Sequence, residues 1–147
     1  MKKIVFDTGV EEYQIGGGVL RFNPSDLNMY NRFFQAEGKI LEIEKELETQ
    51  EKQAGDDHKA SLEAAHKADE KIKKILSEIF GAGNDFEAIF QGVNCTAVGH
   101  NGERVITNFL IAVTPIIKDG AERVAKAEAQ NAVAKANLNQ AQRRALK

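Results

Sequence analysis

Apolar residues in the first half of the chain recur at alternating intervals of four and three. They are Met29, Phe33, Ala36, Ile40, Ile43 and Leu47. This spacing places them on one narrow stripe of a helix, the seam of a coiled coil. Asn23 and Asp26 stand just before the stripe, and we expect Asn23 to cap the helix. Tyr30, Phe34 and Leu41 widen the stripe, so we expect the start of this helix to join the core.

A second segment with the same spacing follows after a short polar turn. Its apolar positions are Leu62, Ala65, Ile72, Leu76 and Ile79, with Asp69 as the one polar residue among them. Gly55 suits the end of the first helix, and Asp57 suits the cap of the second. Two helices joined by so short a loop form an antiparallel hairpin. We expect residues 23–80 to form such a hairpin and its tip to project from the body.

The first 22 residues follow a different pattern, with short β-prone runs separated by turn residues. The runs are residues 3–6, 12–15 and 19–22, and the turns are residues 7–9 and 16–18. Branched and aromatic side chains between turn residues predict a β-hairpin or a three-stranded meander. A sheet this small must pack against helices to be stable.

The broadest apolar face lies between residues 105 and 117. It consists of Val105, Ile106, Phe109, Leu110, Val113, Ile116 and Ile117. This face predicts a buried helix, and we expect Pro115 to kink or end it. Further upstream, Asn84 and Glu87 fit a capping box for a short helix, with Asn84 as the cap. Residues 93–102 lack a helical period and are predicted to be a loop.

The C-terminal segment is rich in alanine: nine of the 26 residues from Ala121 to Leu146 are of this type. Alanine favours helix but offers little surface to bury. We therefore expect a helix that is weakly anchored to its own body and that contacts a partner helix or a second copy. The candidate partner-binding residues are Val124, Val133, Leu138, Arg143, Arg144 and Lys147.

These patterns combine into one domain over residues 1–147, a length typical of a single globular unit. The predicted fold class is α+β and mainly helical: a small N-terminal β-hairpin or meander packs on a four- to five-helix domain with a projecting antiparallel helical hairpin. The expected parts are a β-rich segment (1–22), the hairpin (23–80), core helices (81–118) and the alanine-rich basic helix (119–147).

The net charge of −2 conceals an uneven distribution. Residues 25–54 carry four basic and seven acidic groups, whereas residues 103–147 carry eight basic and four acidic groups. The longest apolar stretch, residues 108–117, is about half the ~20 residues that a membrane span requires. Asp7 interrupts the apolar run that a signal peptide needs. With a single cysteine, these features predict a cytoplasmic protein that does not contact a membrane.

The candidate chemistry is sparse. Cys95 and His100 share a loop, but no neighbouring residue supplies an orienting carboxylate for nucleophilic catalysis. The three histidines and one cysteine lack the paired spacing of a zinc site. Residues 16–18 lack the lysine of a phosphate-binding loop, and residues 81–83 follow a helix rather than a strand, so both are predicted to be turns. We expect no enzyme activity, cofactor or metal.

Three stretches of the chain resemble the tail assembly chaperones of long-tailed bacteriophages and prophages, particularly those of Gram-positive hosts. The first is Glu12–Asp26, a short sheet that leads into a long acidic helix. The second is Ile79–Gly92, a helix stop followed by a small aromatic helix. The third is Asn108–Lys118, an apolar helix before a charged, alanine-rich tail.

The resemblance implies a non-enzymatic protein of the bacterial host cytoplasm. Such a protein binds the helical tape measure protein before assembly and yields as tail tube subunits polymerise. Two other functions remain open: a structural phage protein of the capsid, connector or tail, and a small DNA-associated regulator. The basic end of the chain lacks the interleaved aromatic residues of nucleic-acid readers, so nucleic acid is not an expected partner.

Overall fold

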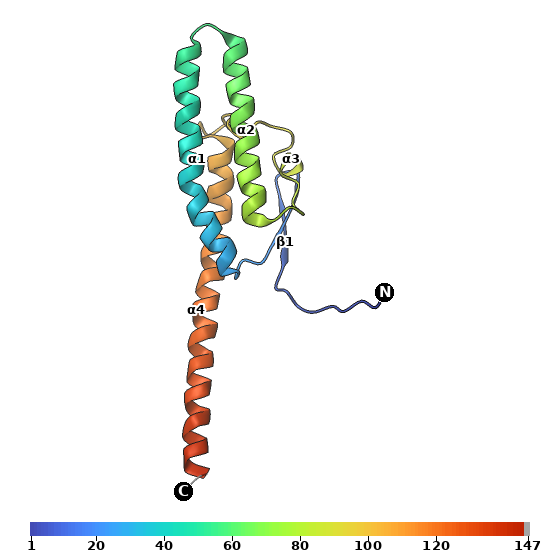
Figure 1. Cartoon of the computed structure of the whole chain (residues 1–147), viewed down its shortest axis with the longest axis vertical. Coiled ribbons are helices and arrows are strands. Elements are labelled where there is room, and N and C mark those ends of the chain that lie inside the picture. The colour runs from blue at the N-terminus through green and yellow to red at the C-terminus, as the bar shows by residue number, and fades with distance from the viewer. Residues whose placement is uncertain (146–147) are drawn as a thin grey trace.

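Two long helices lie antiparallel and side by side in the computed structural model, which describes residues 1–145 and the side chains as far as Asn139 (Figure 1). Helix α1 spans Leu27–Ala54 and α2 spans His58–Phe80. The predicted seam of α1 is buried, except that Ile43 is half-buried. Gly55, with a φ of +53°, ends α1 as predicted. The Asp57 carboxylate caps α2 as predicted by accepting the Ala60 N–H at 3.2 Å.

The start of α1 differs from the prediction. The cap is Asp26, whose carboxylate accepts the Asn28 N–H at 3.0 Å. The side chain of Asn23 instead accepts the Ser25 N–H at 2.7 Å, within a turn that precedes the helix. The prediction that Asn23 caps α1 is therefore wrong. Asparagine forms such local turns as readily as it forms caps, and the position of the first helical residue decides between the two.

Some apolar residues of the two helices remain in solvent. Phe34 and Leu41 of α1 are 59% and 52% exposed, and Leu62 of α2 is 71% exposed. The predictions that Phe34 and Leu41 join the core and that Leu62 lies in the seam are wrong. Helix α1 packs on α2 along its seam and meets α4 over a short stretch, so side chains outside those contacts have no neighbour to cover them.

The N-terminal sheet is a two-stranded antiparallel hairpin of β1 (Glu11–Ile15) and β2 (Gly18–Phe22). Leu20 and Phe22 point into the core. Residues 3–6 form no strand, so the hairpin prediction is confirmed and the meander alternative is wrong. A turn separates them from β1: the Asp7 carboxylate accepts the Gly9 N–H at 2.8 Å, and Gly9 has a φ of +70°. The chain upstream of this turn leads away from the sheet (Figure 1).

One asparagine joins the hairpin to the helices. The side chain of Asn84 accepts the Arg21 N–H at 2.7 Å and donates to the carbonyls of Arg21 and Phe80 at 3.0 Å. It therefore pairs with the edge of β2 as a neighbouring strand would. The short helix α3 (Phe86–Ile89) is capped by Asp85, so the predicted capping box at Asn84 is wrong. The Asn84 side chain does not cap α3, because β2 passes directly beside it and takes its hydrogen bonds.

Helix α4 runs without interruption from Val105 to Ala145. The expectation that Pro115 ends this helix is wrong, and the predicted core helix and alanine-rich helix are one element. Proline removes a single helical hydrogen bond. Val113 and Ile117 on either side are fully buried, and their burial offsets the loss of that hydrogen bond. Helix α4 still contacts the body at Arg123, which lies 3.6 Å from Glu11 of β1, and at half-buried Val124, and beyond these residues it extends away from the body (Figure 1).

The core lies where β2 and the four helices meet. It contains a group of aromatic rings whose neighbouring centroids lie 5.1–6.4 Å apart: Phe22, Phe80, Phe86, Phe90 and Phe109. Edge-to-face contacts within this group add to the stabilisation from burial. The described residues thus form a mainly helical protein with four helices and one hairpin. None of the helices in the described range is long and apolar enough to span a membrane.

Candidate protein-interaction site

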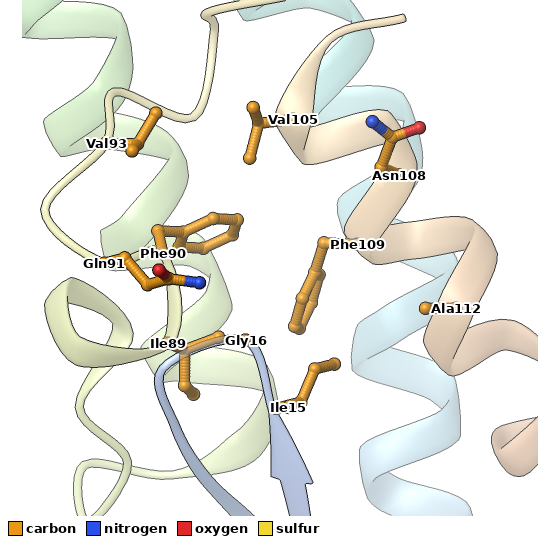
Figure 2. Close-up of a pocket in the computed structure, with 10 residues that line it drawn as sticks. All are labelled: Ile15, Gly16, Ile89, Phe90, Gln91, Val93, Val105, Asn108, Phe109 and Ala112. Atoms are coloured by element: carbon orange, nitrogen blue, oxygen red, sulfur yellow. The ribbon is translucent and has the colours of Figure 1, made fainter. Parts of the chain in front are cut away.

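An apolar cleft of about 390 Å³ opens between the β1–β2 turn, α3 and the first turns of α4 (Figure 2). Phe90 and Phe109 contact each other at its floor, with ring centroids 5.3 Å apart. Two amide side chains, those of Gln91 and Asn108, stand among its apolar walls. The full lining is Ile15, Gly16, Ile89, Phe90, Gln91, Val93, Val105, Asn108, Phe109 and Ala112.

Glycines build one wall of the cleft. The Gly17 N–H donates to the Ile89 carbonyl at 3.2 Å, which ties the tip of the hairpin to α3. A Cβ atom at Gly16 would lie 2.1 Å from that same carbonyl oxygen, and Gly16 also has a φ of +55°. Only glycine meets both requirements. The predicted turn at residues 16–18 is confirmed, and its glycine content follows from this close approach.

A buried ion pair stands behind the opposite wall. Lys73 Nζ lies 3.0 Å from Asp69 Oδ2 and 2.9 Å from Glu87 Oε1, and it donates to the Val93 carbonyl at 3.3 Å. The second carboxylate oxygen of Asp69 accepts the Cys95 N–H at 2.8 Å. These bonds hold the loop that carries Val93 against α2 and α3. Asp69, predicted as a polar residue within an apolar seam, therefore positions the cleft.

The electrostatics of this cluster follow from its burial. Burial alone lowers the pKa of Lys73, but hydrogen bonds to Glu87 and Asp69 outweigh this effect and leave the pKa raised. Lys73 therefore stays protonated. Burial, together with the adjacent Asp69 carboxylate, raises the pKa of the Cys95 thiol well above its usual range.

Cys95 and His100 occupy different environments. Cys95 is fully buried, whereas His100 is exposed. The raised pKa keeps Cys95 as a thiol, which is a weak nucleophile. Within the described residues, no three His, Cys, Asp or Glu side chains are grouped as metal ligands. The loop therefore serves as packing for the core and as one wall of the cleft.

The burial of Cys95 has a direct chemical consequence. We expect iodoacetamide at about pH 8 to alkylate the native protein at least roughly 100-fold more slowly than the urea-unfolded chain, because neither thiolate nor access is available in the native state. Mass spectrometry of samples quenched at successive times measures both rates. Equal rates in the two states would show that Cys95 is open to solvent.

The sequence-predicted partner residues lie apart from the cleft, on the extended half of α4. Val124 is half-buried, whereas Val133 and Leu138 are 60% and 59% exposed. The side chains of Arg143 and Arg144, and all of Lys147, lie outside the described residues. Among the described side chains, Val124, Val133 and Leu138 do not line the cleft, and Val133 and Leu138 remain exposed on α4.

Sequence reasoning predicted the cleft-lining residues as core, turn or loop and missed the cleft itself. The three consecutive glycines at the hairpin turn could have indicated this wall of the cleft, since glycine is expected where two backbones approach closely. The wall that faces them was not visible in the sequence, because Ile89 lies far from Gly16 along the chain.

The cleft offers an open apolar surface with a few hydrogen-bonding groups, a lining that small-molecule sites and peptide-binding sites share. Comparison of the chain with protein-family models, with curated proteins and with solved structures finds no match.

Proposed function

We propose that this protein is a non-enzymatic phage tail assembly chaperone that binds the helical tape measure protein during tail morphogenesis. The observation that carries the proposal is the apolar cleft between the hairpin turn, α3 and α4. A chaperone for an elongated helical client needs an open site for apolar side chains on a stable body. The sequence resemblance supplies the identity of the client.

The shape of the cleft suits the apolar face of an amphipathic helix. Phe90 and Phe109 form its floor, and Gln91 and Asn108 supply amide groups beside it. An amphipathic helix places residues at intervals of three or four on one face, and one or two of these fill a cleft of this size. The α1–α2 hairpin projects from the body with its acidic face in solvent, and this face discourages binding of other acidic surfaces.

Binding in the cleft is tested by titrating the protein with a purified helical segment of a tape measure protein. Ala112 lines the cleft, whereas the adjacent Ile111 is exposed on the same helix and does not line it. We expect Ala112→Glu to weaken client binding at least tenfold, because the carboxylate would be desolvated against apolar groups. Ile111→Glu, the matched control, is expected to leave affinity within about twofold. Isothermal titration calorimetry measures both.

Two results would count against the proposal. The first is equal affinity of both variants for the client, which would place binding elsewhere. The second is stoichiometric incorporation of the protein into purified virions by mass spectrometry, which would favour a structural capsid, connector or tail protein. Absence from virions together with the expected loss for Ala112→Glu would support the chaperone.

A further inference from the structure

The extended half of α4 carries a regular seam that continues from the core. Val113, Ile117 and Gly120 are buried against the body at intervals of four and three. The same intervals continue along the helix beyond the body. We define the terminal seam as Val124, Ala127, Asn131, Ala134 and Leu138.

Large and small residues alternate strictly along the terminal seam. Val124, Asn131 and Leu138 are the larger side chains, and an alanine follows each of the first two. The alternation continues at Ala141 in the sequence. In a parallel pair, each residue would face the equivalent residue of the second copy. Wide and narrow layers would then alternate, and the alanine layers would leave gaps. In an antiparallel pair, each large residue faces an alanine.

We propose that the terminal seam pairs antiparallel with the same seam of a second copy of this chain. In the register that matches large with small, Leu138 lies opposite Ala127 of the second copy, and Asn131 lies opposite Ala134. By the two-fold symmetry of such a pair, every contact occurs twice.

Charges beside the centre of the terminal seam are compatible with this arrangement. Glu128 and Lys135 occupy equivalent positions in successive repeats on one flank of the seam, and both are exposed. In the antiparallel register, Glu128 of one copy lies beside Lys135 of the other, and the symmetry repeats this pair of opposite charges. Gln130 and Asn137 on the other flank are uncharged. The centre of the interface therefore contains no like-charge pair.

The body sets the length of the interface. A Cβ atom at Gly120 would lie 1.7 Å from the Pro24 carbonyl oxygen, so the seam face of α4 is already covered at that point. From Ala121 to Ala145 the helix is about 37 Å long. The proposed register places the end of one helix opposite Gly120 of the other. The two bodies then lie at opposite ends and do not collide.

One leucine and one valine of nearly equal exposure provide the first test. Leu138 lies in the seam, whereas Val133 lies on the other side of the same helix. Sedimentation equilibrium of the full chain at micromolar concentration is expected to show a dimer. Leu138→Asp is expected to raise the dimer dissociation constant at least tenfold, and Val133→Asp to change it less than about twofold. Circular dichroism of both variants checks that they retain the helical content of the parent chain.

The direction of pairing is tested with spin labels at two outward positions, Lys126→Cys and Val133→Cys, while buried Cys95 stays unlabelled. The antiparallel register separates the two labels at position 126 by about 20 Å along the axis and those at position 133 by about 1.5 Å. A parallel pair would give equal separations at both positions. Pulsed electron paramagnetic resonance measures the distances.

A monomer throughout the concentration range, equal label separations, or dissociation by Val133→Asp as strong as by Leu138→Asp would overturn the proposal. Dimer formation requires no client. Loss of the dimer and loss of client binding at the cleft are therefore separate outcomes, measured on different variants.

Discussion

Replacing Gly120 with alanine is expected to lower the free energy of unfolding by about 2–3 kcal/mol, although alanine is the better helix former. The new Cβ atom would lie 1.7 Å from the Pro24 carbonyl oxygen and 3.0 Å from Pro24 Cβ. Pro24 belongs to the turn before α1. Its carbonyl group is part of the backbone, so it cannot move out of contact with the new Cβ atom as a flexible side chain could. Helix α4 must therefore move off the start of α1.

Gly38 in the middle of α1 is the matched control. A Cβ atom at this position meets no other atom within 4 Å. Gly38→Ala is expected to raise the free energy of unfolding by up to about 1 kcal/mol, the ordinary gain from helix propensity. Urea denaturation of the two variants and the parent chain measures the difference. A gain in stability at both positions would show that α4 does not approach Pro24.

Lys73→Met is expected to destabilise the protein by about 3–5 kcal/mol. The side chains of Lys73 and Asp69 are 9% and 11% exposed, and Lys73 Nζ lies 3.0 Å from Asp69 Oδ2. Removing the lysine leaves the Asp69 carboxylate buried without its counter-charge. The Val93 carbonyl loses a donor as well, so the loop behind the cleft is expected to loosen. Urea denaturation measures the loss.

The ion pair itself is isolated with a double-mutant cycle. Asp69→Asn keeps an acceptor for the Cys95 N–H and removes the charge. Lys73→Met combined with Asp69→Asn is expected to be more stable than Lys73→Met alone, because no unpaired charge remains. Glu87→Gln serves as the control with an expected loss below about 1 kcal/mol, since Glu87 is 67% exposed. Additive effects of the two buried substitutions would indicate that the charges do not interact.

Local patterns predicted the elements well because their causes are local. The four-three spacing of apolar residues determined α1 and most of α2, and the turn at Gly55 followed from residue types that end and start helices. The hairpin likewise followed from β-prone runs around three glycines. In each case the residues that decide the structure are near neighbours in the chain, so the sequence by itself displays them.

The candidate site could be predicted only in part. Val133 and Leu138 are exposed, as a weakly anchored helix requires, but the sequence placed them on one partner-binding surface. The continuous α4 helix places them on different sides. The cleft joins Gly16, Phe90 and Phe109 from three separate elements, and no spacing in the sequence relates these three residues.

Long-range contacts decided the remaining features. Asn84 could cap a helix or pair with a strand, and the passage of β2 beside it selected the strand. Pro115 could end a helix, but burial of Val113 and Ile117 carries α4 through it. The local preference for one conformation over the other is worth about 1–3 kcal/mol in each case. Burial of neighbouring residues against distant segments contributes as much or more to the stability of the fold. The sequence determined which elements form, and tertiary packing determined where they end and what they face.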